Sequence, residues 1–239
     1  MSQPSIKTWS FSRLSVFEQC KFRAKLAYID KIPEPPRELP PGKTEHANDR
    51  GTRIHEGAEL FVKNENRIEL LPELNHFKPE LERLRELYQQ GKVSLEGEWA
   101  LDRLWRPVGW NAPDAWVRMK LDAFVRLSPR HAVVIDYKTG KKYGNEVKHG
   151  EQGQLYQLSC FVRFPELERV TVEFWYTDQN DITQTDFSRA VGMRFQPTFE
   201  RRGKEITETR AFTPSPNKYS CRWCPYGPKG TGHCDKGIQ

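Results

Sequence analysis

A chain of 239 residues is long enough to bury a full hydrophobic core, so we expect a single domain over residues 1–239. The 13 Phe, 8 Tyr and 7 Trp exclude a disordered chain, although 29% of the residues are charged. The 38 Lys and Arg against 32 Asp and Glu give a net charge of +6, which is compatible with a nucleic-acid partner without requiring one. The sequence has no signal-peptide core and no run of about 18 apolar residues, so we expect a cytoplasmic protein that does not bind membranes.

Helices are predicted in the first part of the chain. The segment SRLSVFEQCKFRAKLAYI, which begins at Ser12, has apolar residues at helical spacing, and a proline-dense loop follows over residues 32–43. Two more helices are predicted, one over residues 49–63 and one from Pro79 to Gly91, where leucines recur on one stripe.

Short β-rich runs separated by turn residues follow these helices. They cover residues 96–105, 116–127, 131–139 and 169–177. A helix is predicted over residues 151–164, between the last two runs, where it would cross from one strand to the next. This order predicts an α/β fold with a mixed central sheet flanked by helices. The tail from Thr213 is rich in Pro, Gly and Cys and is expected to be irregular.

Two acids lie near the ends of neighbouring predicted strands. The run from Val133 to Ile135 is β-branched, as in a strand buried on both faces, and Asp136 and Lys138 then share one strand face. Asp122 lies on the preceding strand, and two close carboxylates repel each other unless a divalent cation lies between them. Mg²⁺ or Mn²⁺ there would be a Lewis acid for phosphate chemistry, and Lys138 could orient a water molecule. Taken alone, an Asp-x-Lys sequence more often forms an ion pair at a strand end.

Three further residues accompany the acids. His55, on the helix predicted for residues 49–63, is a candidate metal ligand, although a lone histidine is usually an ordinary half-buried residue. Gln152 and Tyr156 share one face of the predicted crossover helix, where both could donate to a phosphate or hold a base. The order of these groups on helix, strand, strand and helix is far more specific than any single member.

The motifs KLDAF, VVIDYKTGK and QGQLY resemble the catalytic motifs of the PD-(D/E)XK nucleases, in the branch related to the RecB nuclease domain. SFSRLSVFEQCKFRAKLAYI and GTRIHEG resemble the opening motifs of that branch, so the resemblance runs from about Ser10 to Cys234. It implies a restriction-endonuclease-like fold and a metal-dependent deoxyribonuclease. The implied metal ligands are His55, Asp122 and Asp136, and the implied catalytic residues are Asp122, Asp136, Lys138, Gln152 and Tyr156. Glu98 falls where the branch often has a strand glutamate.

The cysteines of the tail form a C-x2-C-x9-C pattern at Cys221, Cys224 and Cys234. A structural zinc ion or an iron–sulfur cluster usually has four protein ligands, so these three cysteines need one more. The residues alone leave three alternatives open: reduced cysteines without a ligand, a zinc site completed by Cys20 or His233, and an iron–sulfur cluster. The remaining cysteine, at position 160, lies in an apolar helical run and is expected to be a plain buried thiol.

The family resemblance favours a [4Fe–4S] cluster. It would be held by Cys20, Cys221, Cys224 and Cys234. Iron–sulfur members of the same branch, the CRISPR-associated RecB-like exonucleases and the AddB-type helicase-nuclease subunits, combine one distant N-terminal cysteine with a C-terminal trio. On this interpretation, residues 10–30 and 213–239 form one cluster-binding subregion, in which the tail packs on the N-terminal helix.

We therefore expect an exonuclease that acts on single-stranded DNA or on DNA ends. The alternatives are a structure-selective endonuclease and a non-catalytic DNA-binding or assembly protein of the same fold. The sequence has no P-loop helicase motif, so a helicase or a recombination or CRISPR-type protein is an expected partner. Trp105, Trp110 and Trp116 could stack on unpaired bases. Candidate phosphate contacts are Lys141, Lys142, Lys148 and His149.

Overall fold

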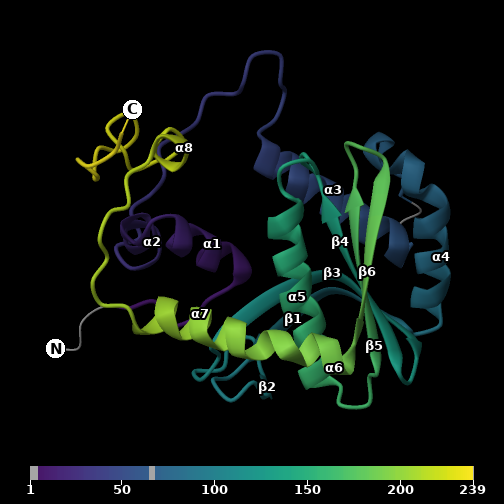
Figure 1. Ribbon diagram of the computed structural model, residues 1–239. Helices are drawn as coiled ribbons and strands as arrows, with labels where there is room; N and C mark the ends of the chain where they lie inside the picture. Colours follow the sequence, from purple (N-terminus) through teal and green to yellow (C-terminus); the bar gives the residue numbers. More distant parts are fainter. Residues whose placement is uncertain (1–4, 65–67, 239) are drawn as a thin grey trace.

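The computed structural model describes residues 5–64 and 68–238 (Figure 1). Its elements in chain order are α1 (Phe11–Gln19), α2 (Lys21–Tyr28), α3 (Ala47–Lys63), η2 (Pro72–Phe77), α4 (Lys78–Gln89), β1 (Val93–Leu101), β2 (Pro107–Val108), β3 (Val117–Ser128), β4 (His131–Lys138), α5 (Glu146–Arg163), β5 (Arg169–Tyr176), β6 (Asp181–Ser188), α6 (Arg189–Gly192), η3 (Met193–Phe195), α7 (Gln196–Glu208) and α8 (Lys218–Cys221). Within these two ranges, no helix has the length and apolar character needed to span a membrane.

A six-stranded sheet in the order β2-β1-β3-β4-β5-β6 forms the centre of the fold. β4 and β5 are parallel, whereas every other neighbouring pair is antiparallel. A parallel pair needs a crossover connection, and α5 supplies it. α5 covers one face of the sheet, while α3 and α4 cover the other (Figure 1). The predicted mixed sheet flanked by helices is therefore confirmed.

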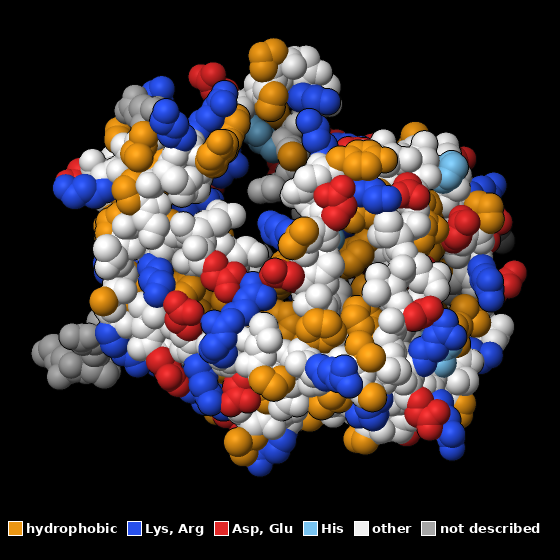
Figure 2. All heavy atoms as spheres, viewed as in Figure 1, with side chains coloured by type: hydrophobic (Ala, Val, Ile, Leu, Met, Phe, Trp, Pro, Cys, Tyr) orange, Lys and Arg blue, Asp and Glu red, His pale blue; other side chains and the backbone are white. Residues whose placement is uncertain are grey.

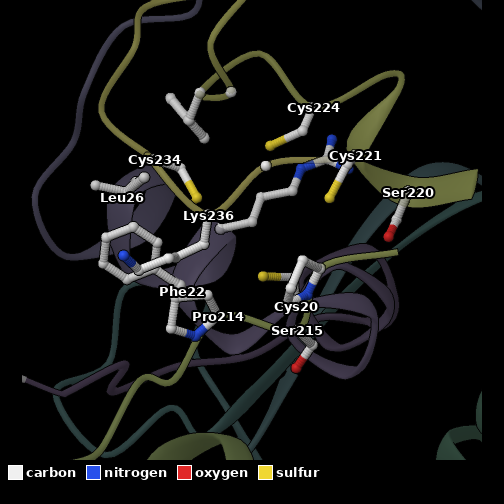
Figure 3. Close-up of a pocket in the computed structure, with 15 residues that line it drawn as sticks. Cys20, Phe22, Leu26, Pro214, Ser215, Ser220, Cys221, Cys224, Cys234 and Lys236 are labelled. Atoms are coloured by element: carbon white, nitrogen blue, oxygen red, sulfur yellow. The ribbon is translucent and has the colours of Figure 1, made fainter. Parts of the chain in front are cut away.

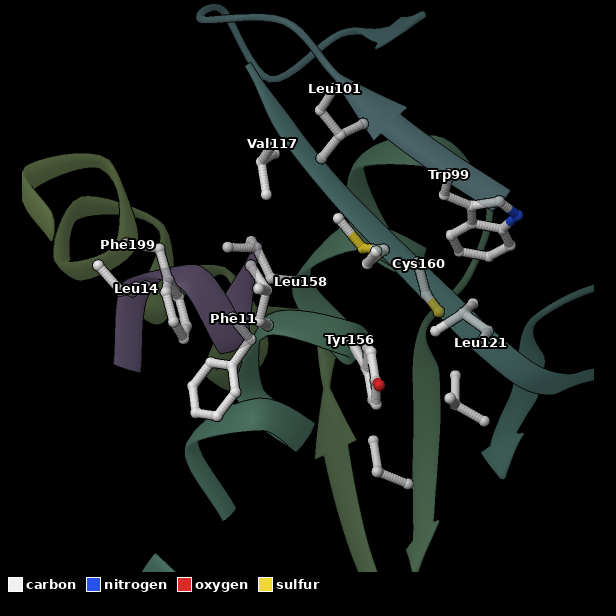
Figure 4. Close-up of a cluster of buried hydrophobic side chains, with 14 of the residues drawn as sticks. Phe11, Leu14, Trp99, Leu101, Val117, Leu121, Tyr156, Leu158, Cys160 and Phe199 are labelled. Carbon is white, nitrogen blue, oxygen red and sulfur yellow. The ribbon is translucent and has the colours of Figure 1, made fainter. Parts of the chain in front are cut away.

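Two hydrophobic cores, one on each face of the sheet, explain the apolar run in β4. Ala132 and Val134 pack into the core beneath α5, whereas Val133 and Ile135 pack into the core beneath α3 and α4. A strand buried on both faces has to be apolar at consecutive positions and not only at alternate ones. Figure 4 shows the first core, where Cys160 is fully buried as predicted, and burial raises the pKa of its thiol.

The first predicted helix is in fact two helices, α1 and α2, which meet at Cys20, so the prediction of a continuous helix is wrong. Cys20 has an extended backbone (φ −161°, ψ 111°), and its N–H donates to the carbonyl of Val16 as α1 ends. The break places Cys20 in the lining of a pocket that it shares with the C-terminal tail (Figure 3). Periodicity could not show the break, because apolar residues keep helical spacing on both sides of it.

Helix α7, which the sequence patterns did not predict, carries the chain back across α1 (Figure 1). Arg202 of α7 forms ion pairs with Glu18 of α1 at 2.7 Å and with Glu151 of α5 at 2.9 Å. The chain then reaches the end of α2, where the Tyr226 hydroxyl donates to the carbonyl of Ile32 at 3.1 Å. The tail therefore packs on the N-terminal helices, as expected.

Two of the three tryptophans suggested for base stacking are core residues, so that hypothesis is wrong for them. Trp105 and Trp116 are buried and meet edge to face, with their ring centroids 5.7 Å apart. Trp116 also donates its indole N–H to the Thr207 hydroxyl of α7 at 3.2 Å. Trp110 is half-buried, and the Arg118 guanidinium lies 5.2 Å from its ring centroid.

Gly203 allows α7 to lie close to two buried tryptophans. A Cβ atom at this position would lie 2.6 Å from Nε1 of Trp9 and 2.6 Å from Cζ2 of Trp116. We expect Gly203→Ala to lower the free energy of unfolding by up to about 2 kcal/mol, because an overpacking cost of about 1–3 kcal/mol outweighs the roughly 1 kcal/mol gain in helix propensity. Urea unfolding followed by circular dichroism measures the change.

The matched control for this substitution is Gly150→Ala in α5, where an added Cβ meets nothing within 4 Å. We expect this variant to be as stable as the wild type or more stable, because only the gain in helix propensity remains. A Gly203→Ala protein as stable as the Gly150→Ala protein would contradict the close approach of α7.

Candidate active site

Asp122 and Asp136 lie where β3 and β4 stop pairing. The last register pair at this end is Ala123 with Ile135, so the two acids occupy the next positions along the diverging strands. Beyond the last backbone pair, a side chain links the two strands: Oδ2 of Asp122 accepts a hydrogen bond of 2.6 Å from the backbone N–H of Tyr137. Both acids are buried, with 9% and 5% of their surface exposed. The structure thus brings together the two carboxylates that the sequence places on neighbouring strands.

His55 reaches Asp122 from α3, on one face of the sheet. Its Nδ1 lies 3.0 Å from Oδ1 of Asp122, and its ring packs edge-on against Tyr137. Burial raises the pKa of Asp122, and the nearby charge of Asp136 raises it further. Burial alone would lower the pKa of His55, but the hydrogen bond to Asp122 and the surrounding carboxylates raise it overall. The site therefore favours positive charge, whether as an imidazolium or as a bound cation.

Helix α5 contacts Asp136 from the face of the sheet opposite to α3. The Tyr156 hydroxyl donates to Oδ1 of Asp136 at 2.7 Å, and Nε2 of Gln152 lies 3.4 Å from the same oxygen. Nζ of Lys138 lies 2.5 Å from Oδ2 of Asp136 and donates to Oε1 of Gln152 at 2.9 Å. The Asp-x-Lys spacing in β4 and the Gln-x-x-x-Tyr spacing in α5 thus bring four side chains into one hydrogen-bonded cluster.

The oxygen and nitrogen atoms at this site fit a divalent cation. Among the residues that the structure describes, none donates a hydrogen bond to the buried Oδ2 of Asp136, although the Lys138 ammonium is close enough for an ion pair. Beside it, His55, Glu96 and Asp122 each offer one ligand atom, and these three atoms lie within 4.8 Å of one another. Carboxylate oxygens are the ligands that Mg²⁺ and Mn²⁺ prefer.

Glu96 is the member of the site that the sequence reasoning missed. Its neighbours in β1 pair with the residues on either side of Asp122 in β3, so Glu96 lies opposite Asp122. It has a left-handed backbone (φ 47°), and burial, with Asp122 nearby, raises its pKa. Glu98, which the family resemblance favours, instead pairs with Lys120 at 3.2 Å on the surface. The two glutamates share one face of a regular strand, so only the register on β3 distinguishes them.

The basic loop after β4 is only partly available for contact with phosphates. Lys142 forms an ion pair with Asp181. His149 is half-buried, and burial lowers its pKa to about 4, so it is neutral at pH 7. Lys141 and Lys148 are exposed. Two of the four candidate phosphate contacts therefore present an open positive charge beside the site.

Four of the five cysteines line one pocket at the junction of the N-terminal helices and the tail. Cys20 comes from the break between α1 and α2, and Cys221, Cys224 and Cys234 come from the tail. Figure 3 shows their sulfur atoms directed towards a shared space. The N–H of Cys224 donates to the carbonyl of Cys221 at 3.1 Å, which closes a tight turn between these two residues. His233 is exposed and lies outside the lining, so Cys20 is the better placed candidate for a fourth ligand.

Comparison with known proteins relates the chain to nucleases. A family model for the PD-(D/E)XK nuclease superfamily matches residues 8–228. The crystal structure of SSO0001 is similar in fold, with a TM-score of 0.51 at 15% sequence identity over 98% of this chain and 88% of that chain. No curated protein sequence matches the chain.

Two structures of the alkaline exonuclease LHK-Exo from Laribacter hongkongensis also match. The first has a TM-score of 0.29 at 14% identity and covers 84% of this chain and 90% of that chain. The second, in complex with dAMP, has a TM-score of 0.31 at 13% identity and covers 84% and 88%. TM-scores of this size do not establish a shared fold.

Glu96 and Glu98 offer a direct test of which glutamate belongs to the site. We expect Glu96→Gln to weaken Mn²⁺ binding by about 10-fold or more, as other changes around metal ligands do. The same variant without metal should have a higher Tm, because it removes a carboxylate whose charged form is disfavoured by burial and by Asp122. Calorimetric Mn²⁺ titration and thermal unfolding measure the two effects. Glu98→Gln is the matched control and should change neither; equal Mn²⁺ affinities for the two variants would remove Glu96 from the site.

Proposed function

Since the chain belongs to the PD-(D/E)XK nuclease superfamily and is therefore a phosphodiester hydrolase, we propose that it is a RecB-like deoxyribonuclease that degrades single strands or DNA ends. One observation carries the proposal. Asp122 and Asp136 lie side by side where two strands diverge, with Lys138 held 2.5 Å from Asp136. In metal-dependent cleavage of a phosphodiester, carboxylates hold the cation and a fixed positive charge beside the reacting phosphate stabilises the transition state.

Nucleases of this superfamily use divalent metal ions. We assign the cation, Mg²⁺ or Mn²⁺, to His55, Asp122 and Asp136, with Glu96 as a further carboxylate. The ligand atoms of His55, Glu96 and Asp122 lie within 4.8 Å of one another, and Asp136 is included because it lies beside Asp122 where β3 and β4 stop pairing. When bound, it supplies a Lewis acid for the phosphate oxygens and a more acidic water molecule. The half-buried position of the site keeps these charges poorly screened by solvent, which strengthens their effect on the substrate.

Lys138 is the residue that we propose acts on the phosphodiester itself. Its Nζ is fixed between the Asp136 carboxylate and the Gln152 amide oxygen and lies 5.2 Å from the ring centroid of Phe174. A cation fixed in this way stabilises the negative charge that develops on the phosphate, and its N–H groups can orient a water molecule. Gln152 and Tyr156 hold Lys138 and Asp136 in this arrangement, which supports catalysis over a non-catalytic DNA-binding role.

The shape of the molecule supports a single-stranded substrate. Figure 2 shows a deep hollow between the lobe formed by the N-terminal helices and the tail and the part that carries α5, with Lys and Arg side chains along its rim. A flexible single strand follows a hollow of this kind more easily than a rigid duplex, and the basic rim attracts its phosphates. Since the sequence has no P-loop motif, we propose that duplex is opened by a helicase or a recombination or CRISPR-type partner.

We propose that the tail cysteines and Cys20 hold a [4Fe–4S] cluster and not zinc. Among the described residues, no three of these sulfur atoms lie within 4.8 Å of one another. A tetrahedral zinc ion with sulfur ligands at about 2.3 Å would hold the sulfurs roughly 3.8 Å apart, so the wider arrangement favours the larger group. The cluster would join residues 10–30 to residues 213–239 within a single domain. Closing a loop of about 200 residues removes conformational entropy from the unfolded chain, so its role would be structural.

Asp136→Asn and Lys138→Met separate metal binding from chemistry. We expect Asp136→Asn to lose both Mn²⁺ binding and DNA cleavage, because it removes a ligand charge. Lys138→Met should still bind Mn²⁺ but cleave roughly 100- to 10,000-fold more slowly, the usual cost of losing a charge-stabilising or acid–base group. Gel assays on end-labelled single strands measure the rates. The control is Lys78→Met, which changes an exposed lysine of α4 outside the site.

A circular single strand tests the mode of cleavage in the same assay, because it has no ends. An exonuclease leaves it intact while degrading the linear strand, whereas rapid cutting of the circle would show an endonuclease. Wild-type cleavage by Asp136→Asn would disprove the assignment of the site.

If one cluster joins the N-terminal helices to the tail, removal of an N-terminal or a C-terminal cysteine ligand should have the same effect on cluster content and stability. Cys20→Ser and Cys221→Ser, purified without oxygen, should both lose bound iron, labile sulfide and visible absorption, and both should be less stable. Cys160→Ser should keep the iron, because that thiol is buried in the core beneath α5. A colourless wild-type protein that contains one zinc per chain would overturn the cluster and leave the nuclease proposal standing.

A further inference from the structure

Two aromatic side chains on the tail are unusually exposed. Tyr219 is 90% exposed and Trp223 is 72% exposed. Aromatic side chains of this size normally bury most of their surface, because that burial is a large source of stability. Neither residue belongs to the two cores or to the candidate active site. Two such side chains lie only four positions apart in the tail, and exposed apolar residues that gather in one region mark binding sites more often than scattered single ones.

Each of the two aromatic residues has a basic neighbour in the sequence, Lys218 beside Tyr219 and Arg222 beside Trp223. The Arg222 guanidinium lies 5.0 Å from the ring centroid of Trp223. The groove beside Trp223 lies between the α2–α3 loop and the tail, and its lining includes Pro35, Pro36, Arg37, Arg222, Trp223 and Lys229. Residues 213–239 contain four Lys or Arg and one Asp or Glu, a difference of +3. That single acid, Asp235, pairs with Lys236, so the other three basic residues have no acidic side chain as a partner within the described tail, residues 213–238.

We propose that this surface is a stacking platform for single-stranded nucleic acid, separate from the active site. The platform consists of Lys218, Tyr219, Arg222, Trp223 and Lys229. Bases would stack on the Trp223 and Tyr219 rings, and the cations would contact the phosphates on either side. Tyr, Trp and Arg are common at protein interfaces as well as at single-strand sites, but Lys is depleted at protein interfaces. The two lysines and the net positive charge of the tail therefore favour nucleic acid over a protein partner.

The position of the platform suits a strand that extends beyond the active site. Figure 1 shows α8 and α5 in separate parts of the molecule, and the space-filling view of Figure 2, from the same side, shows a hollow between these parts with basic side chains along its rim. A strand gripped on the platform would continue into the hollow towards α5. The inference rests on the proposed function for the identity of its ligand, but it assigns binding to residues that take no part in the chemistry.

Binding can be measured without cleavage, in EDTA, with the full chain and a fluorescein-labelled oligothymidylate of about 20 nucleotides, which exceeds one single-strand site. We expect Trp223→Ala to raise the Kd about 5- to 100-fold, the effect of losing one stacked base, and Trp223→Phe to bind nearly as well as the wild type. Leu104→Ala is the control. Leu104 is also a large apolar side chain that is 70% exposed, but it lies between β1 and β2, and its loss should leave the Kd unchanged.

Trp223 lies between Cys221 and Cys224, so its substitution could also disturb the cysteine site. Two variants that leave this segment unchanged therefore test strand binding independently. Tyr219→Ala should weaken binding measurably, and Lys218→Ala with Lys229→Ala should weaken it and flatten its dependence on salt. Unchanged Kd values in Trp223→Ala and in these variants, at wild-type iron content, would overturn the platform. A dimer that Trp223→Ala dissociates without changing the Kd would also overturn it, because the surface would then bind protein.

Hydrolysis of bis(p-nitrophenyl) phosphate with Mn²⁺ separates this inference from the proposed function. That small substrate reaches the active site without touching the tail, so Trp223→Ala should hydrolyse it at the wild-type rate. Loss of strand binding with intact hydrolysis supports the platform. Failure of the wild type to hydrolyse any phosphodiester would contradict the proposed nuclease, while the Kd values in EDTA would still decide the platform.

Discussion

The burial of two carboxylates at the diverging ends of β3 and β4 is the constraint on which the rest of the site depends. Hydrophobic cores on both faces of the sheet fix the two strands, so Asp122 and Asp136 cannot relieve their repulsion by moving apart. The repulsion is offset by positive groups, His55 beside Asp122 and Lys138 beside Asp136. A divalent cation would offset it more strongly, so the feature that destabilises the metal-free site is the one that creates affinity for metal.

The fold explains why these groups converge from different elements. β4 lies in the middle of the sheet and is followed by the crossover helix α5, which returns over the face that Asp136 and Lys138 share. α3 packs on the other face and presents His55 to Asp122 through the gap where the strands part. Buried cores therefore position every charged group, and no flexible loop is needed to complete the cluster. Arg202 of α7, the helix that leads into the tail, links α1 to α5 through two ion pairs.

Local periodicity predicted the parts of the site that depend only on one element. Asp136 and Lys138 share a face because any strand has a period of two, and Gln152 and Tyr156 share a face because any helix repeats after about 3.6 residues. Glu96 could not be distinguished from Glu98, since that choice depends on how β1 is registered on β3. Trp105 packs on Trp116, Trp116 bonds to Thr207 of α7, and Cys20 lines a pocket with the tail. These contacts join segments far apart in the sequence, so no local pattern contains them.

The central claim is that the two buried carboxylates share a divalent cation, and anomalous diffraction from crystals soaked in Mn²⁺ tests it most directly. We predict a strong peak within about 2.0–2.3 Å of carboxylate oxygens from both Asp122 and Asp136, with His55 as a further ligand. In the metal-free crystal, Nδ1 of His55 should remain within hydrogen-bond distance of Oδ1 of Asp122, as it does in this structure. Manganese bound only by exposed acids, in a protein whose crystals still cleave DNA, would contradict the account.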